Sequence, residues 1–334
     1  MAEHSDIEWT DATWQIITGC RVLSPGCINC YAMSLAGTRL RNHPSRVGLT
    51  TKTKTGPVWT GQVRFNEQWL TQPLQWKRPR RIFVCAHGDL FHEDVPDAWL
   101  DKVFAVMALA PQHTFQVLTK RAKRMREYLY PNGRIEIWER AVEIAGALNV
   151  TFPLPNVWLG VSAERQQEAN ERIPYLLGTP AAVRFVSLEP LLGPIDLEAL
   201  HPDGVQTLDA LSGLSVNPAY TGWSRLDLVI AGGESGGRAR PMHPAWPRAI
   251  ARQCADAGVS FFFKQWGSWA PSTPDEAKGN PHSGWLANAA HPHVARASEL
   301  YPEAGASFVA RIGKKRAGRL LDGVEHNGMP ERAE

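Results

Sequence analysis

Three of the five cysteines in the chain lie within a stretch of eleven residues, at Cys20, Cys27 and Cys30. Three thiolates on one short loop can bind three irons of a cubane [4Fe-4S] cluster and leave the fourth iron open. A closed cluster or a structural zinc site uses four protein ligands instead. Because an open iron can bind and activate a small molecule, the spacing predicts chemistry at this loop.

Two other roles for these cysteines remain open from the sequence. The spacing of Cys27 and Cys30 is that of a zinc knuckle, but no second cysteine or histidine pair follows at the spacing of a finger or ribbon. A disulfide would leave one of the three cysteines unpaired, and nothing else in the sequence indicates secretion. We therefore favour iron–sulfur ligation, with zinc or simple thiols as the alternatives.

The length and composition indicate a globular protein. A chain of 334 residues can bury a full hydrophobic core, and α/β barrels of this size are commonly one domain. We find no apolar run of membrane-spanning length and no signal-peptide pattern in the first eleven residues. We therefore expect a cytoplasmic protein with no membrane partner. A reducing compartment also suits unpaired cysteines.

The positive charge is clustered, although the net charge is only +3. Three basic clusters occur, at residues 77–81, 120–126 and 314–316, and the chain contains 13 tryptophans. Cationic residues beside aromatic ones can bind phosphates and stack bases, so nucleic acid is a candidate partner. Solvated helix faces and core tryptophans are the ordinary explanation of the same composition.

Short apolar runs alternate with helical patterns along the chain. The runs are short and rich in β-branched or aromatic residues, as in buried parallel strands, and they occupy residues 82–86, 114–118, 157–161, 183–186, 226–231 and 259–263. Residues 100–107 and 246–257 carry apolar side chains at helical spacing. With a strand-like run at 12–19, the pattern predicts a full or partial parallel (β/α) barrel of about six or seven strands.

The expected organisation is one domain with a C-terminal extension. Residues 1–265 form the barrel, and residues 266–334 form a lid or extension of the same domain. Residues 42–81 are rich in Thr, Gly, Pro and Arg without a sustained period, which indicates an irregular insertion. In the extension, His282, His291 and His293 are candidate metal ligands, although surface histidines are the commoner case.

Polar residues follow the predicted strands, at 87–89, 119–121, 162–164, 187–189, 232–235 and 264–266. Barrel enzymes build their active sites at the carboxyl ends of the strands, so we expect these residues to surround the cysteine loop. Lys120, Arg121 and Lys264 provide positive charge for an anionic substrate. Cys85 shares the strand parity of His87, so its thiol is either a hydrogen-atom donor or a core residue.

These features resemble the radical SAM superfamily, in which a three-cysteine loop precedes an α/β chain with polar strand ends. The sequence is more similar to a phage-associated three-cysteine family of largely unknown function, at the edge of that superfamily. The segments that carry this similarity are residues 6–11, 88–93, 118–121 and 319–323. The resemblance covers nearly the full length. The chain departs from the superfamily pattern because six residues, not three, separate Cys20 from Cys27, and because Tyr31 follows the third cysteine, whereas the superfamily places an aromatic residue before it.

The resemblance implies cofactors and a reaction. Cys20, Cys27 and Cys30 would bind a [4Fe-4S] cluster, and S-adenosylmethionine (SAM) would chelate the open iron. A reductant such as flavodoxin or ferredoxin would supply the electron that cleaves SAM. The resulting 5′-deoxyadenosyl radical would act on an anionic substrate, with nucleic acid lesion repair or base modification as candidates. The alternatives are a zinc-stabilised nucleic-acid-binding protein and a SAM-independent iron–sulfur redox or sensor protein.

The resemblance also suggests which residues would bind SAM. Gly232-Gly233-Glu234 is similar to the Gly-Gly-Glu element that accepts the methionine amino group, and Gly88-Asp89 is its rival by position along the chain. Tyr31 would stack near the adenine. Serine and glutamate at the ends of two further strands would contact the ribose or the methionine moiety, at Ser162, Glu164, Ser187 and Glu189. An N-cap role is the structural alternative for the two serines.

Overall fold

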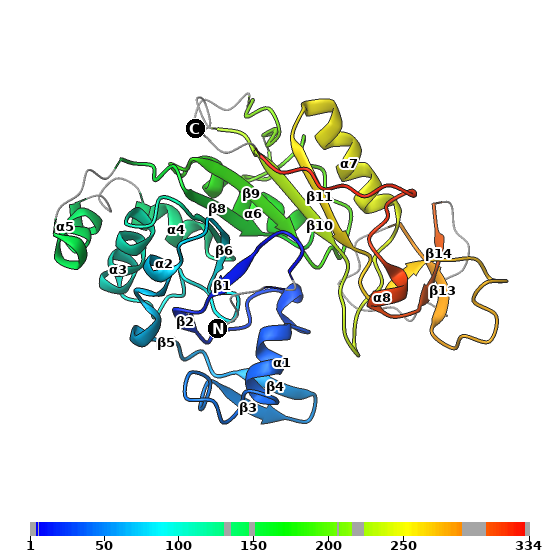
Figure 1. Cartoon of the computed structure of the whole chain (residues 1–334). Helices are drawn as coiled ribbons and strands as arrows, with labels where there is room; N and C mark the ends of the chain where they lie inside the picture. Colours follow the sequence, from blue (N-terminus) through cyan, green and yellow to red (C-terminus); the bar gives the residue numbers. More distant parts are fainter. Residues whose placement is uncertain are drawn as a thin grey trace. The chain divides into compact units, whose positions relative to one another are not determined.

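The computed structural model describes residues 5, 7–129, 135–146, 151–205, 207–215, 224–288 and 305–330. Seven strands form the central sheet in the order β1-β6-β7-β8-β9-β10-β11 (Figure 1). They span Ala12–Trp14, Arg81–Val84, Thr114–Thr119, Val157–Ser162, Val183–Leu188, Leu228–Gly232 and Ser260–Gln265. The pairs β1–β6, β6–β7, β7–β8, β9–β10 and β10–β11 are all parallel.

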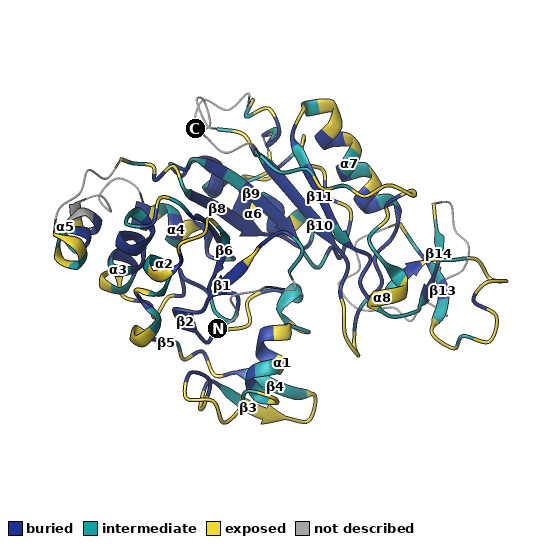
Figure 2. Cartoon of the chain, in the orientation of Figure 1, coloured by how far each residue is buried: buried dark blue, intermediate teal, exposed yellow. Residues whose placement is uncertain are grey.

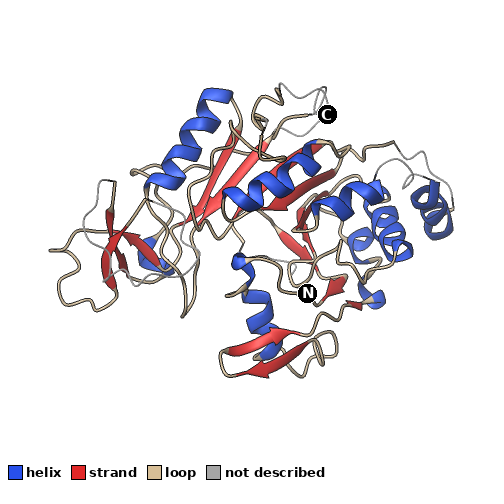
Figure 3. Cartoon of the chain, turned by 180° about the vertical axis from the view of Figure 1, so that it is seen from behind, coloured by secondary structure: helices blue, strands red, loops and turns tan. Residues whose placement is uncertain are grey.

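Helices alternate with these strands, as the apolar periodicity predicts (Figure 3). They are α3, α4, α5, α6 and α7, spanning Asp97–Ala108, Ala122–Leu129, Ile135–Ala145, Gln166–Leu177 and Ala245–Ala257. Gly258 ends α7 with a φ of 64°, a conformation that glycine adopts readily. The expected parallel α/β sheet is therefore confirmed. It is the partial form of the barrel, because the strand order of the sheet ends at β1 and at β11.

The chain divides into two compact units. Unit 1 comprises residues 1–161, 178–184 and 332–334, and unit 2 comprises residues 162–177 and 185–331. Each unit has its own buried apolar side chains, which include Trp14 and Phe115 in unit 1 and Phe185 and Phe263 in unit 2. The strands of the sheet are mostly buried, whereas α7 has an exposed face (Figure 2). In the described residues, no helix has the length and apolar character needed to span a bilayer.

The segment predicted as an irregular insertion carries regular elements, so that part of the prediction is wrong. It contains the hairpin β3–β4, the short strand β5, the 3-10 turn η2 and the short helix α2, spanning Thr50–Thr53, Gly56–Trp59, Arg64–Phe65, Glu67–Trp69 and Gln72–Gln75. The predicted first strand is also divided. Only β1 joins the central sheet, whereas β2 (Ile17–Thr18) pairs with β5. Short elements of two to four residues give too little periodicity to be recognised in the sequence.

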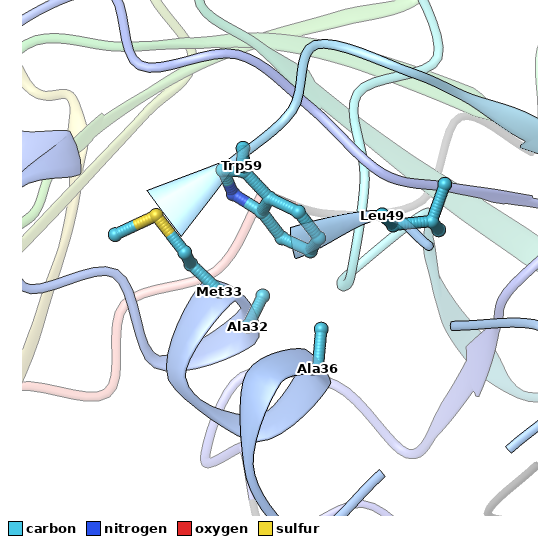
Figure 4. Close-up of a cluster of buried hydrophobic side chains, with 5 residues drawn as sticks. All are labelled: Ala32, Met33, Ala36, Leu49 and Trp59. Carbon is cyan, nitrogen blue, oxygen red and sulfur yellow. The ribbon is translucent and has the colours of Figure 1, made fainter. Parts of the chain in front are cut away.

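A small apolar cluster connects the insertion to the helix that follows the cysteine loop. This helix, α1, spans Tyr31–Gly37. Its buried face packs against the hairpin in a cluster composed of Ala32, Met33, Ala36, Leu49 and Trp59 (Figure 4). Cys20 and Cys30 pack against the edge of this cluster. The insertion therefore supports the cysteine loop.

The C-terminal extension has its own sheet within unit 2. Strands β12, β14 and β13 pair in that order and antiparallel, and the short helix α8 follows; these elements span Trp269–Pro271, Ser307–Arg311, Ser283–Leu286 and Lys314–Ala317. The extension packs back on β11, because Phe263 N donates to His326 O at 3.0 Å. His291 and His293 lie outside the described residues.

Candidate functional site

The cysteine loop begins where two chain segments meet. After β2, Gly19 adopts a φ of 96° and forms a parallel bridge with Gly88, which follows β6. Gly19 N donates to His87 O at 3.2 Å. A side chain at Gly88 is excluded, because its Cβ would lie 2.7 Å from Ile17 O. The glycine in the sequence Gly88-Asp89 is therefore explained by close backbone contact.

The loop itself is compact. The long gap after Cys20 is partly taken up by the 3-10 turn η1, which spans Pro25–Cys27. Cys27 N donates to Ser24 O at 2.9 Å, and Cys30 N donates to Cys27 O at 3.2 Å. Cys30 then precedes the first turn of α1. All three cysteines are partly buried, so the loop holds its thiols at the protein surface on a short, hydrogen-bonded turn.

The Cys27 thiol lies within electrostatic reach of both other thiols of the loop. Burial raises the pKa of Cys20 to about 12, and the negative charge of Asp89 adds to the rise. Burial likewise raises the pKa of Cys30. A charge on Cys27 would raise the pKa of both. Cys20 and Cys30 therefore resist ionisation, and a bound metal would supply the positive charge that stabilises their thiolates.

In the described parts of the chain, no three Cys, His, Asp or Glu side chains converge closely enough to hold one ion. A cubane cluster binds each cysteine through a different iron, so its ligands stand farther apart than the ligands of one ion. The donor set, three sulfurs without a fourth cysteine on the loop, fits the cluster that the sequence predicts.

Arg121 contacts Cys20 across a long sequence separation. Its Nη1 lies 3.7 Å from the Cys20 Sγ and 2.9 Å from Asp89 Oδ2. Its Nε lies 3.0 Å from Glu93 Oε2. The Arg121 side chain is only 5% exposed. This guanidinium, predicted to bind an anionic substrate, is instead buried between two carboxylates and a cysteine sulfur.

Asp89 is the centre of this network. Its Oδ1 accepts hydrogen bonds from Thr119 Oγ1 at 2.6 Å and from Phe91 N at 3.0 Å. Its Oδ2 accepts from Lys120 N at 3.2 Å as well as from Arg121. These bonds join the turn after β6 to the end of β7. The predicted cofactor contact of Asp89 stays a prediction, but the structure already gives this carboxylate four partners.

A second arginine contacts the turn after β6. Arg46, from the insertion, is buried, with a relative exposure of 4%. It donates to Ser45 Oγ at 2.6 Å and to His87 Nδ1 at 2.9 Å. The ring of Tyr31 meets the His87 ring edge-on, with centroids 5.8 Å apart, and Tyr31 Oη donates to Ala86 O at 2.7 Å. Tyr31 is thereby fixed beside the cysteine loop.

Cys85 lies in the tight turn that follows β6. It is 3% exposed and has a φ of 57°, which is rare for a residue with a side chain. Burial raises the pKa of its thiol to about 12. Cys85 N donates to Trp14 O at 2.8 Å. The thiol is therefore a neutral interior group, which agrees with a core residue and leaves hydrogen-atom donation as a prediction.

In unit 2, the predicted residues after β8 belong to a buried ion pair. Glu164 is fully buried and lies 3.2 Å from the Nη1 of Arg172, which is 4% exposed. The same Nη1 donates to Ser162 O at 2.7 Å, and Glu164 O accepts a hydrogen bond from Leu192 N at 2.9 Å. These bonds hold the end of β8 to α6 and to the segment after β9.

The residues after β9 form another ion pair. Glu189 Oε1 lies 3.0 Å from Lys264 Nζ, at side-chain exposures of 15% and 19%. Ser187 Oγ donates to Glu189 Oε2 at 3.3 Å, and Ser162 Oγ donates to Glu189 O at 3.4 Å. Four of the predicted site residues therefore do meet in unit 2, and Lys264 is matched with an acid.

The Gly232-Gly233-Glu234 element is tightly packed against the segment after β11. A Cβ at Gly232 would lie 2.8 Å from Glu189 Oε1, and a Cβ at Gly233 would lie 2.0 Å from Trp266 O. Glu234 is engaged on both oxygens by Arg240, whose Nη2 lies 2.6 Å from Oε1 and whose Nε lies 2.9 Å from Oε2. Close backbone contact inside unit 2 therefore requires glycine at position 233, whereas the contact at Gly232 is with the end of a side chain that can move.

Two residues of the site were not singled out by the sequence. Arg46 lies in a segment without periodicity, and no local pattern marks an arginine that becomes buried. Glu93 closely follows the Gly88-Asp89 pair in the sequence. No local pattern relates it to Arg121, which lies 28 residues later. For His87, the sequence predicts only a place in a polar segment after a strand, at residues 87–89. A buried cation beside the cysteine loop is a property of the tertiary contacts.

No curated protein and no solved structure matches the sequence. A family described as "Protein of unknown function (DUF5131)" matches residues 4–330. This match includes the cysteine loop, the central sheet and the C-terminal extension. Because nearly the whole chain is covered, the protein belongs to the DUF5131 family.

Proposed function

We propose that this protein is a radical SAM enzyme in which Cys20, Cys27 and Cys30 bind a [4Fe-4S] cluster and SAM occupies the open iron. The observation that carries the proposal is the cysteine loop: three partly buried thiols on one short loop, with Cys27 within electrostatic reach of both Cys20 and Cys30. The other two cysteines, Cys85 and Cys254, are buried in the turn after β6 and in α7.

When bound, such a cluster supplies the electron that cleaves SAM into methionine and a 5′-deoxyadenosyl radical, which abstracts hydrogen from the substrate. The residues of the chain position the ligands. Arg121 is held by Asp89 and Glu93 and presents Nη1 to the Cys20 sulfur. A cation and a hydrogen bond at a ligand sulfur favour the reduced state of a cluster. Tyr31, fixed by Ala86 O, provides an aromatic surface for the adenine.

The proposed substrate is anionic, and we favour nucleic acid undergoing lesion repair or base modification. The support is the clustered basic charge together with a guanidinium on an aromatic face: Arg80 lies 4.9 Å from the centroid of Trp76. Part of the basic charge of α4 is already matched, because Arg124 pairs with Asp97 and Lys123 with Glu127. The exposed residues Lys77 and Arg78 are therefore better candidates for phosphate contacts than α4. The proposed reductant is a flavodoxin or ferredoxin.

Anaerobic purification and cluster reconstitution test the function. We expect a brown protein that binds about four irons per chain, is bleached by dithionite and forms 5′-deoxyadenosine from SAM. Cys27→Ala should lose the iron and the product, whereas Cys254→Ala should keep both. A colourless protein with stoichiometric zinc would overturn the proposal. A reducible cluster that never yields 5′-deoxyadenosine would favour the SAM-independent sensor.

The nucleic-acid part of the proposal has its own test. Binding of single-stranded DNA is measured as a function of salt for the wild type and for Lys77→Ala with Arg78→Ala. We expect the double variant to bind more weakly and with a smaller salt slope. A protein that makes fewer phosphate contacts releases fewer counterions when it binds. Lys52→Ala with Lys54→Ala, on the exposed β3–β4 hairpin, is the matched control. Negligible wild-type binding would remove nucleic acid as the substrate.

A further inference from the structure

The two arginines beside the turn after β6 differ in their charge balance. Arg121 lies between the carboxylates of Asp89 and Glu93. Arg46 is equally buried, but among the described residues no carboxylate pairs with it. Its hydrogen bonds go to Ser45 and to His87, all of them uncharged acceptors. Its Nε is buried without a hydrogen-bond partner in the described structure.

A buried, unmatched guanidinium is unfavourable, because an arginine cannot release its proton to escape the desolvation cost. The nearest charged groups do not help. Arg64 is another cation, and burial raises the pKa of the neighbouring Cys85 thiol to about 12, so this thiol stays neutral. Among the residues that the structure describes, Arg46 therefore has no negative charge to balance it.

His87 connects Arg46 to a potential ligand through a hydrogen bond. Arginine only donates hydrogen bonds, so His87 Nδ1 must be the acceptor in the 2.9 Å contact with Arg46 Nη2. The ring proton is then on Nε2, and His87 is a partly exposed residue. A cation bound to Nδ1 polarises the ring and makes the Nε2–H a stronger donor. Arg46 and His87 together form a fixed donor directed away from Arg46.

We propose that Arg46 and His87 form an oxyanion-binding site beside the cysteine loop, with the His87 Nε2–H as the contacting donor and Arg46 as the positioning residue that supplies the charge. The ligand chemistry is a carboxylate or a phosphate. The carboxylate of SAM is one source and the phosphate of a substrate is the other. The choice of SAM rests on the proposed function; the anion site itself does not.

The first test reads the tautomer. A long-range proton–nitrogen NMR spectrum of the protein should show His87 protonated on Nε2 in the wild type. In Arg46→Met we expect signals of both neutral tautomers. A His87 that carries its proton on Nδ1 in the wild type would overturn the proposal. This measurement needs no cluster, so it remains valid if the chain binds no iron and the radical SAM proposal fails.

The second test measures anion binding by calorimetry, with inorganic phosphate as the probe and chloride at matched ionic strength as the blank. We expect at least a tenfold loss of affinity in Arg46→Met and in His87→Phe. His87→Phe keeps a ring against Tyr31 but removes the donor. Arg41→Met, an exposed arginine near Arg46 in the chain, is the control and should bind as the wild type does. If Arg46→Met does not fold, His87→Phe and His87→Gln still decide the outcome.

The source of the anion is separated on the cluster-loaded protein. If SAM binds more tightly than decarboxylated SAM, and His87→Phe abolishes this difference, the site binds the SAM carboxylate. Equal binding of the two, with phosphate binding that depends on His87, assigns it to a substrate phosphate. Phosphate affinity that is unchanged in both variants, together with no discrimination between SAM and its decarboxylated analogue, would overturn the proposal.

Discussion

The two units balance their buried charges differently. In unit 2, Glu164, Glu189 and Glu234 each bind a basic partner, at 3.2, 3.0 and 2.6 Å respectively. In unit 1, Arg121 is matched twice while Arg46 has no acid among the described residues. Charges that are matched within the fold stabilise it, whereas an unmatched buried charge indicates a place for a ligand.

This difference changes which of the predicted site residues we expect to bind a ligand. The acids of unit 2, expected to contact SAM, have partners that account for their presence structurally. The sulfurs, the aromatic ring and the unmatched cation all belong to unit 1. We therefore expect variants in unit 2 to affect folding first, and variants at the cysteine loop or the Arg46–His87 site to affect ligand binding first.

The largest effect is expected from Glu164→Gln. The change leaves the Arg172 guanidinium buried without its carboxylate, which should lower the free energy of unfolding by about 3–5 kcal/mol. Urea unfolding followed by circular dichroism measures the change. Glu171→Gln, exposed on the same helix α6, is the control. A Glu164→Gln protein of normal stability that no longer binds SAM would make Glu164 a ligand contact and remove the distinction between the units.

A smaller loss of stability is expected from Gly233→Ala. The added Cβ would lie 2.0 Å from Trp266 O, and this contact is with backbone that cannot move aside alone. We expect a loss of about 1–3 kcal/mol in the free energy of unfolding, as for other overpacked sites. Gly237→Ala has no atom within 4 Å of its Cβ and should change little. Equal stabilities, measured by thermal unfolding, would contradict the packing explanation of the Gly-Gly-Glu element.

A double-mutant cycle on Glu189 and Lys264 measures their ion pair. Both side chains are partly exposed, at 15% and 19%, so we expect a coupling energy of roughly 0.5–2 kcal/mol. The cycle compares Glu189→Gln, Lys264→Met and the double variant by urea unfolding. Negligible coupling would free Lys264 for the anionic substrate that the sequence predicts. Substantial coupling would make the pair part of the structural frame of unit 2.

The smallest effect is expected at an exposed ion pair of unit 2, Arg248 with Asp322. Arg248 hydrogen-bonds to Asp322 and holds the pKa of this carboxyl below its usual range. The resulting stabilisation is present above the unfolded-state pKa and is lost as the pH falls through the folded-state pKa. Because both side chains are exposed, Asp322→Asn should cost at most about 1 kcal/mol at neutral pH. An equal cost at pH 2 and pH 7 would show that the ion pair is not its cause.

Much of the fold could be predicted from the sequence, because its signals are local. The six apolar runs all became strands, and the helical stripes at 100–107 and 246–257 lie in α3 and α7. The prediction for the insertion is wrong because its strands are two to four residues long and depend on partners outside the segment: α1 packs on the β3–β4 hairpin, and β2 pairs with β5. Such elements depend on contacts that a short window of sequence does not contain.

At the candidate site, the sequence by itself determined the three cysteines and the order of the polar strand ends. Only the tertiary structure decided how the charges are matched. The contact of Arg121 with Cys20 joins residues 101 apart, and that of Arg46 with His87 joins residues 41 apart. Lys120 and Arg121 look like a free cationic pair in the sequence, yet Arg121 is neutralised by Asp89 and Glu93. Charge balance is a property of neighbours in space, so the cation left for an anion, Arg46, was visible only once the chain had folded.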